Sequence, residues 1–238
     1  MVQPSLPTAA AFVLIVLGVV AAFIYAVRWT GARRGDAPAT VRRDTLRAAV
    51  GASLYLAATA GVAASGVLAR DGVPPPLMVF LVGTNLVSIG VAFSRLGTRL
   101  VQGLPLVALV GVQAFRLPLE LILHRWYEEG VLPITMTYAG RNFDIISGVL
   151  GLIVLLWAVR GTVPRAVVRL ANLVGFALLL RVASIAVMSS PIPLRQYFEG
   201  PPVLLALHVP TVWIVPFCVG GALAAHLMTF RALRRRPA

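Results

Sequence analysis

Residues 9–28 read AAAFVLIVLGVVAAFIYAVR, a run of twenty residues in which only the last side chain is charged. A helix needs roughly 20 mainly apolar residues to cross about 30 Å of hydrocarbon, because each residue adds about 1.5 Å. The sequence has no ten-residue apolar/polar alternation of the kind that marks membrane strands, so we expect an all-α protein. Comparable apolar stretches follow near residues 47–69, 76–95, 101–125, 143–160, 167–189 and 206–230. Together they predict a seven-transmembrane-helix bundle that forms one integral membrane domain over residues 1–238.

The composition supports membrane insertion and excludes several chemistries. Hydrophobic residues make up 59% of the 238 positions and charged residues only 12%, against about a quarter in soluble domains. All 21 basic residues are arginine, and the absence of lysine excludes a retinal or pyridoxal Schiff base and a phosphate-binding loop. The single cysteine, Cys218, excludes internal disulfides, cysteine-ligated iron–sulfur clusters and cysteine-rich zinc sites.

The arginines are distributed unevenly between alternate loops, and cytoplasmic loops retain positive charge during insertion. The pattern predicts that the N-terminus lies outside, that the C-terminus is cytoplasmic and that residues 9–28 are a retained signal anchor of a multi-pass protein of the bacterial inner membrane. We interpret the arginine-rich first loop as a topology determinant in preference to a binding site for anionic lipid. No nucleic-acid role is expected, since the charge lies on one membrane face without interleaved aromatic residues. The arginines on the predicted cytoplasmic side are Arg28, Arg33, Arg34, Arg42, Arg43, Arg47, Arg95, Arg99, Arg160, Arg165, Arg169, Arg231, Arg234, Arg235 and Arg236.

Small residues recur every four positions in the second span, at Ser53, Ala57, Gly61 and Ser65. Such a strip lets helices approach closely. We expect it to pack inside the bundle and not to form a dimer interface. The same is expected of small and polar residues in the third and seventh spans, which are Gly83, Asn85, Ser88, Gly90, Gly220, Gly221 and Ala225.

The fourth span, GVQAFRLPLELILHRWYEEG at residues 111–130, interrupts the apolar pattern with a polar stripe. Its members share one helix face, because they are three or four residues apart. A charged side chain at the centre of a span costs about 2.5–3.5 kcal/mol, so the stripe should face the bundle interior. A pair at positions i and i+4 also permits an ion pair between the arginine and the glutamate. The stripe consists of Gln113, Arg116, Glu120 and His124.

Pro118 lies within this stripe and has no backbone N–H to donate, which predicts a kink or local opening of the fourth span. Two prolines, Pro210 and Pro216, predict an irregular last span near its outer end. The proline-rich segment at residues 189–202 is expected to cap the bundle there.

Three further polar residues, Asn142, Asp144 and Arg181, are expected at the depth of the stripe. In the segment at residues 130–148, Asn142 is a candidate helix cap, and Asp144 is favoured by the dipole of the following helix. The sixth span places Arg181 in its outer half, on the same face as Ser184. The pattern therefore predicts a shared pocket, while the segment before Asp144 remains open as a lid, a re-entrant loop or a surface loop.

The charge of this pocket decides between two hypotheses. Arg116 and Arg181 against Glu120 leave an excess positive charge that would attract an anion. If the Asp144 carboxylate cancels this excess charge, the cluster is a structural salt-bridge network instead.

Histidines give little support to a metal or haem site. His124 and His208 are both expected near the outer face, where they permit a two-histidine site with Glu120 or Asp144. His226 lies roughly 27 Å from His208 if the chain between them is helical, and we expect it to be a packing residue near the cytoplasmic end. No metal-binding or haem-attachment motif is present, so no metal ligand is assigned and no cofactor is expected.

Three segments resemble a family of uncharacterised bacterial polytopic integral membrane proteins. They are QAFRLPLELILHRWYEEGVLPITMTYAGRNFDI, SSPIP and PTVWIVPFCVGGALAAHL, within about the last 130 residues. The resemblance implies a membrane protein and supplies no activity.

The leading hypothesis is a polar pocket in the outer half that binds or transports a small anionic or protonatable solute across the lipid bilayer. Arg116 and Arg181 would hold the anion, Glu120 and His124 would exchange protons, and Gln113, Asn142 and Asp144 would complete the pocket. The alternatives are an intramembrane enzyme, acid/base or metal-assisted, acting on a lipid or periplasmic substrate, and a sensor or membrane-complex subunit without chemistry. We lean against an enzyme, and no catalytic residue is assigned because no nucleophile lies beside a base.

Overall fold

The computed structural model describes residues 2–234, which form helices and connecting segments without any strand. Six helices in this part of the chain are long and apolar enough to cross a membrane, and a shorter apolar helix lies between the fourth and the fifth. The all-α class is therefore confirmed. The long helices are α1 (Leu6–Arg33), α2 (Pro38–Ala64), α3 (Pro76–Phe93), α5 (Leu106–Gly111) continued by η2 (Val112–Phe115) and α6 (Arg116–Glu128), α8 (Arg165–Ser189), and η5 (Thr211–Ile214) continued by η6 (Val215–Val219) and α9 (Gly220–Leu233); the shorter one is α7 (Ile145–Arg160).

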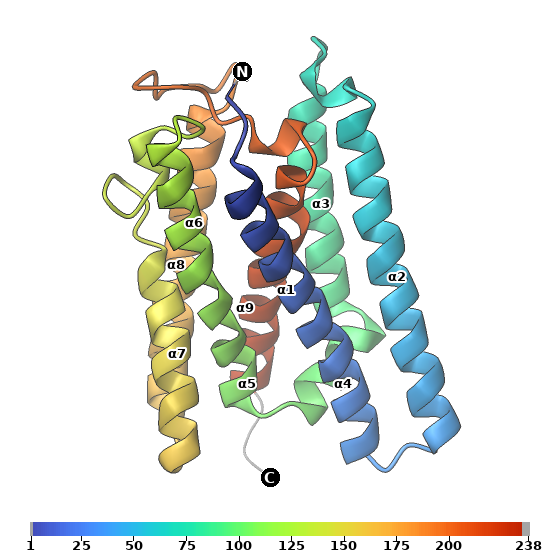
Figure 1. Cartoon of the computed structure of the whole chain (residues 1–238). Coiled ribbons are helices and arrows are strands. Elements are labelled where there is room, and N and C mark those ends of the chain that lie inside the picture. Colours follow the sequence, from blue (N-terminus) through green and yellow to red (C-terminus); the bar gives the residue numbers. More distant parts are fainter. Residues whose placement is uncertain (1, 235–238) are drawn as a thin grey trace.

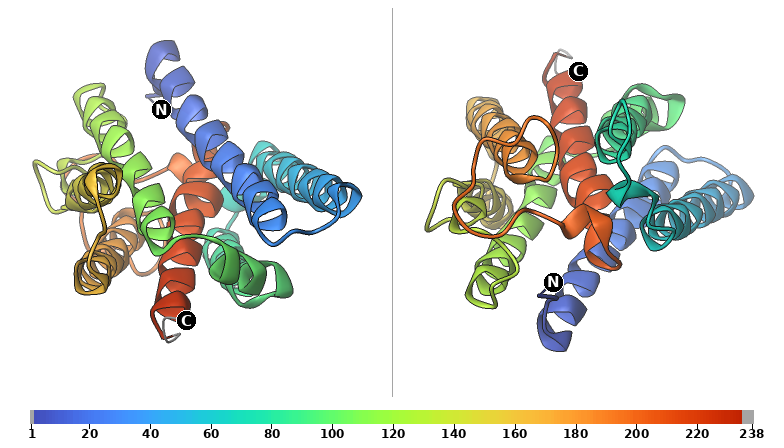
Figure 2. Two further views of the ribbon diagram at one scale, coloured as in Figure 1. Left: turned by 90° about the horizontal axis from the view of Figure 1, so that it is seen from below. Right: turned by 90° about the horizontal axis from the view of Figure 1, so that it is seen from above.

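The last helix lies at the centre of the bundle and α2 lies at its rim (Figure 1 and Figure 2). Two-thirds (67%) of the apolar window in Thr211–Leu233 is buried, against 11% of that in Pro38–Ala64. The central helix packs on α3, α5 and α8, while α2 packs mainly on α1. Side chains on the inner faces of these helices therefore converge on η6 and α9.

The two ends of the bundle differ in charge. We call the end where α1 begins the upper end and the end where α9 finishes the arginine-rich end (Figure 1). At the upper end, Glu129 accepts hydrogen bonds from the backbone nitrogen and the hydroxyl of Ser5, at 2.9 and 2.7 Å, and from the Thr8 hydroxyl at 3.2 Å. These bonds tie the start of α1 to the end of α6.

At the arginine-rich end, two predicted boundaries are wrong. The second helix begins at Pro38 and not near residue 47, and a separate helix, α4 (Arg95–Gly103), replaces the third loop and the start of the fourth span. Arginine is a good helix former, so the basic residues of the expected loop extend α2 beyond its apolar part. The break after α4 occurs at Leu104 and Pro105, where the backbone is extended.

The segment at residues 130–144 folds back into the bundle. It descends from the top of α6 to about mid-height, where α7 begins and continues to the arginine-rich end (Figure 1). A short 3-10 turn, η3 (Ile134–Met136), packs on α6 and α8. Thr135, Thr137 and Asn142 are almost completely buried. Ile134, Ala139, Arg141 and Phe143 are exposed, so the segment packs one side against the interior and leaves the other at the surface of the bundle.

Glycines bring α7 into backbone contact with the preceding span. A Cβ atom on Gly148 would collide with the backbone nitrogen of Leu117, and one on Gly151 would lie 2.7 Å from the backbone nitrogen of Ala114. Only a residue without a side chain fits at these two positions. This close approach brings the start of α7 against the polar stripe of α6.

The small-residue strip of α2 does not pack as predicted. Ser53, Ala57, Gly61 and Ser65 are all exposed, because α2 presents its opposite face to α1. Between α3 and α9 the prediction is correct for Ser88 and Gly220, which lie directly against each other. It is wrong for Gly90, which is exposed, and a Cβ on Gly83 or Gly90 would meet no atom within 4 Å.

Both predicted irregularities are present. A 3-10 stretch, η2, lies immediately before the turn that contains Pro118, and the last span begins with a 3-10 turn and a π-helical turn around Pro216. Proline has no backbone N–H to donate, so one hydrogen bond of the helix is absent in each case and the preceding turn adopts a different hydrogen-bonding pattern. The segment at residues 189–204 crosses the upper end as expected (Figure 2), and the short turn η4 (Leu205–Leu207) follows it.

Candidate functional site

A buried polar network lies at mid-depth, where α6, α7, α8 and α9 meet. We define the interior network as the side chains of Arg116, Glu120, Asn142, Asp144, Ser147, Asn172 and His226, all of which are almost completely buried. The short segment before α7 and the first turn of that helix supply three of them. The network therefore depends on a helix that begins inside the bundle.

Arg116 is the centre of the interior network. Its guanidinium forms an ion pair with the Asp144 carboxylate. Nη1 also donates to the backbone carbonyl of Gly175 and to Nε2 of His226, each at 3.3 Å. The expected partner, Glu120, forms no ion pair with Arg116. The carboxylate from α7 takes this position because the glycine contacts bring its helix start beside α6.

His226 connects Arg116 to Asn172. Arginine has no acceptor, so Nε2 of His226 accepts from Arg116 and Nδ1 carries the proton that is donated to Oδ1 of Asn172 at 2.8 Å. The amide of Asn172 donates in turn to the backbone carbonyl of His226 at 3.4 Å. A Cβ on Gly175 would lie 2.9 Å from the imidazole ring, so this glycine leaves the space that the histidine occupies.

Asn142 joins the two carboxylates of the network. Its amide nitrogen donates to Oε2 of Glu120 at 2.7 Å and to the carbonyl of Met136 at 3.1 Å. Its amide oxygen accepts from the backbone nitrogen of Asp144 at 3.0 Å, and the Ser147 hydroxyl donates to that carboxylate at 2.9 Å. Asn142 therefore orients Glu120 and Asp144 and does not act as the cap of α7 that the sequence suggested.

An internal cavity of about 130 Å³ opens next to the network, toward the upper end. Glu120, Arg116 and Asp144 lie on its wall, and Asn85 and Ser190 are its other polar residues. The rest of the lining is apolar and includes Leu119, Leu123, Met136, Leu179, Val182, Val203, Leu205, Ala206, Ile214 and Val215. The cavity thus suits a small, largely apolar molecule with one polar group.

Three residues of the predicted pocket lie apart from this wall. The Arg181 side chain is exposed, with Nε donating to the carbonyl of Arg141 at 2.9 Å and its guanidinium 4.8 Å from the ring centre of Phe143. His124 is one turn above Glu120 and stacks on Tyr138, with ring centres 4.5 Å apart. The amide of Gln113 donates to the carbonyl of Ala222 at 3.2 Å, below the cavity.

The predicted excess of positive charge is therefore wrong. On α8 the buried face contains Gly175, Leu179 and Val182, and Arg181 is about 200° around the helix from Leu179. Arg181 thus points outward and finds a carbonyl and an aromatic face in place of a carboxylate. Without it, two carboxyl groups and one guanidinium line the cavity.

His226 and Asn172 are the members of the network that sequence reasoning missed. The span of Arg116 begins at residue 106 and not at 101, which moves Arg116 toward the arginine-rich end by about 7 Å. His226 is about as far from that end on α9, so the two side chains meet. The available signal was a polar side chain within each of two predicted spans, at Asn172 and His226.

The arrangement bears on the chemistry proposed from the sequence. Within residues 2–234, no group of three or more His, Cys, Asp or Glu residues is placed to hold a metal ion. Among the same residues, no hydrogen bond or ion pair joins His124 to Glu120, the acid and base imagined for an intramembrane enzyme.

Comparison with protein-family models, with curated proteins and with solved structures finds no match for the chain. The function is therefore argued from the interior network and its cavity.

Proposed function

We propose that the chain crosses the bacterial inner membrane seven times, with α7 as the short fifth crossing, the upper end outside and the arginine-rich end in the cytoplasm. The uneven distribution of arginine supports this orientation. The start of α7 at mid-depth is consistent with a crossing, since the segment at residues 130–144 covers the remaining depth and packs its buried residues against α6 and α8. Irregular backbone at this depth is tolerated when it is covered by protein.

We further propose that the cavity binds a small, largely apolar solute that carries one protonatable group, and that Glu120 receives this group. The carrying observation is the balance of charge on the cavity wall, where two carboxyl groups face a single guanidinium. An added anion would be repelled by the Glu120 and Asp144 carboxylates, and the guanidinium of Arg116 is already paired with Asp144. A protonated amine or another hydrogen-bond donor complements the wall instead.

Glu120 is the carboxyl group available for this role. Asp144 is already engaged by Arg116 and by the Ser147 hydroxyl. Glu120 has one side-chain partner, Asn142, which donates to a single carboxylate oxygen. Asn142 thus fixes the orientation of Glu120 and leaves the carboxyl group able to accept from a molecule in the cavity.

The test uses purified protein in a neutral detergent with three probes of similar shape: cyclohexylamine, cyclohexanol and cyclohexanecarboxylate. We expect the amine to raise the apparent melting temperature most and the carboxylate not to raise it. In the variant Glu120→Gln the effect of the amine should disappear while the protein still folds, because glutamine can accept the bond from Asn142.

Glu128→Gln, on the same helix but exposed at the upper end, is the matched control and should respond to the amine like the wild type. Stabilisation by the carboxylate alone would restore the anion hypothesis. An unchanged response of Glu120→Gln to the amine would contradict the role of Glu120.

A further inference from the structure

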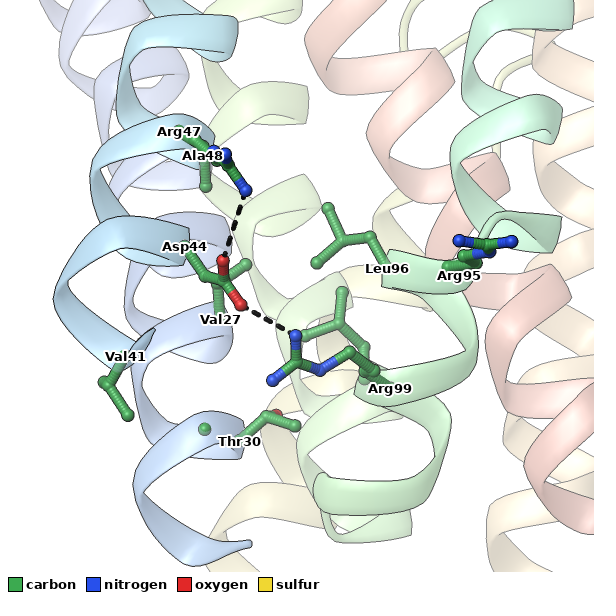
Figure 3. A pocket seen from close by; sticks show the side chains of 11 residues that line it. Val27, Thr30, Val41, Asp44, Arg47, Ala48, Arg95, Leu96 and Arg99 are labelled. Atoms are coloured by element: carbon green, nitrogen blue, oxygen red, sulfur yellow. Dashed lines mark hydrogen bonds and ion pairs between the residues drawn. The ribbon is translucent and has the colours of Figure 1, made fainter. Parts of the chain in front are cut away.

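A second cavity, of about 290 Å³, opens at the arginine-rich end between α1, α2 and α4. Figure 3 shows it from close by, with Arg47 and Arg99 on either side of Asp44. The cavity has no residue in common with the interior network. Its charged lining residues are Arg47, Arg95, Arg99 and Asp44. The rest of its wall is largely apolar and consists of Val27, Thr30, Gly31, Val41, Ala48, Leu96 and Leu100.

The three arginines differ in how far their charge is already compensated. Arg99 donates to Asp44 at 2.7 Å and forms an ion pair with Asp36. The hydrogen bond to Asp44 is the main reason that the pKa of Arg99 is raised, against a smaller opposing effect of burial. Among the described residues, Arg47 forms an ion pair only with Asp44, at 3.9 Å, and 71% of its side chain is exposed. Arg95 has no ion pair or hydrogen bond to another side chain within residues 2–234.

Thr30 contributes an unpartnered hydroxyl to the same cavity. The residue is 2% exposed, and its Oγ1 has no hydrogen-bond partner in the described part of the chain. Gly103 lies against it, and a Cβ on that glycine would be 3.1 Å from Oγ1, so α4 holds the threonine in place. A buried hydroxyl without a partner is destabilising, and an acceptor that reaches it on binding would offset this cost.

We propose that this cavity binds a phosphate group, with Arg47 and Arg95 facing its charge and the Thr30 hydroxyl donating to one of its oxygens. Arg99 acts as an anchor that keeps α2 and α4 in register. The apolar side chains of Val27, Leu96 and Leu100 then contact the carbon atoms attached to the phosphate. A phospholipid supplies both parts, because its phosphate is esterified to a glycerol that carries acyl chains. A soluble phosphate ester would leave the apolar wall uncovered.

Binding is measured on delipidated protein in neutral detergent by native mass spectrometry and by the apparent melting temperature. The probes are phosphatidylglycerol, the matching diacylglycerol without phosphate, and glycerol 3-phosphate. We expect phosphatidylglycerol to bind and stabilise and diacylglycerol to do neither. Glycerol 3-phosphate should bind much more weakly, whereas equal affinity would assign the phosphate site to a soluble ester.

The double variant Arg47→Gln/Arg95→Gln should bind phosphatidylglycerol about 25-fold more weakly, since each surface arginine contributes roughly fivefold. The matched control Arg160→Gln/Arg169→Gln removes the same charge from exposed positions of α7 and α8 at the same end and should keep wild-type affinity. Thr30→Val preserves shape and charge and should weaken binding about threefold or more.

Three results would overturn the proposal. The first is equal binding of diacylglycerol and phosphatidylglycerol, which indicates apolar contact alone. The second is an equal loss in the two double variants, which indicates non-specific attraction to the whole charged end. The third is unchanged affinity in both Arg47→Gln/Arg95→Gln and Thr30→Val. Because Arg47 and Arg95 carry no strong ion pair, the lipid-free melting temperature of their double variant should match the wild type.

Discussion

The interior network and the arginine-rich cavity are built from the same chemical groups in opposite surroundings. In the interior, the side chains of Arg116 and Asp144 are 2% and 5% exposed. In the arginine-rich cavity, those of Arg99 and Asp44 are 35% and 18% exposed. A buried ion pair must have every partner in place, because removing one leaves an uncompensated charge, while a hydrated pair tolerates change. The comparison teaches that the Arg116–Asp144 pair is fixed by burial, whereas the Arg99–Asp44 pair remains partly hydrated.

The largest difference in stability is expected between alanine substitutions of one glycine beside each cluster. Gly148→Ala places a Cβ against the backbone of Leu117, where no side chain can move away, so we expect loss of folded protein or a severe drop in melting temperature. Gly51→Ala, on α2 near the arginine-rich cavity, meets no atom within 4 Å. It should leave stability equal to or slightly above wild type, by up to about 1 kcal/mol. Equal tolerance at both positions, seen in detergent melts, would remove the contrast in packing.

The next largest difference is expected between the two aspartates that pair with arginine, Asp144 and Asp44, when each is replaced by asparagine. Asp144→Asn leaves Arg116 buried without its counter-charge and should cost about 3–5 kcal/mol. Asp44→Asn should cost at most about 1 kcal/mol, because Arg99 is partly exposed and still pairs with Asp36. Chemical unfolding of the two variants in the same detergent measures the loss in free energy of unfolding for each. Similar costs at the two sites would show that burial is not what distinguishes them.

The carboxylate of Glu129 at the upper end, with 16% of its side chain exposed, provides an intermediate case. Burial acts to raise the pKa of Glu129, but hydrogen bonds from Ser5 and Thr8 outweigh it and lower the pKa below its ordinary value. A lowered folded-state pKa means that the stabilisation is present above the unfolded-state pKa of about 4.3 and is lost as the pH falls through the folded-state value.

The wild type should therefore lose up to about 1 kcal/mol more than Glu129→Gln on acidification from pH 6 to pH 3. Melting temperatures across this range, with Glu128→Gln as the exposed control, measure the effect. Parallel curves for the wild type and Glu129→Gln would contradict it.

The smallest effect is expected at Arg181. Its guanidinium contacts a carbonyl and an aromatic ring at the surface of α8, so Arg181→Gln should change stability by about 0.5 kcal/mol or less. The same variant should keep the wild-type response to cyclohexylamine, because the side chain does not line the interior cavity. A loss of that response would return Arg181 to the pocket that the sequence predicted.

Much of the interior network follows from spacing in the sequence. Arg116 and Glu120 repeat at the period of a helix within an apolar span, and the cost of charge in lipid turns such a stripe inward. Asn142 and Asp144 precede the next apolar run, and the structure brings both beside that stripe. Local periodicity and polarity brought these four residues together but did not give their partners, since Arg116 pairs with Asp144 and Asn142 bonds to Glu120.

Other residues depended on tertiary packing that periodicity does not contain. Arg181 has no other charged residue three or four positions away that would indicate which face of the helix is buried. Its guanidinium can bond to a nearby carbonyl at the surface and does not need an interior carboxylate. His226 and Asn172 required the relative depth of two helices, which shifted when the span of Arg116 began after α4. The exposed strip of α2 likewise shows that small residues permit close packing without specifying a partner.

The start of α7 at mid-depth has a consequence for synthesis of the chain. Its sixteen residues extend about 24 Å, less than the hydrocarbon thickness, and its first backbone N–H groups would meet lipid if the helix stood alone. The ribosome delivers α6 first, carrying Arg116 and the backbone surface that receives Gly148 and Gly151. On the proposed seven-crossing topology, we expect α6 and α7 to leave the insertion machinery together as a hairpin, since α6 supplies the surface that α7 requires.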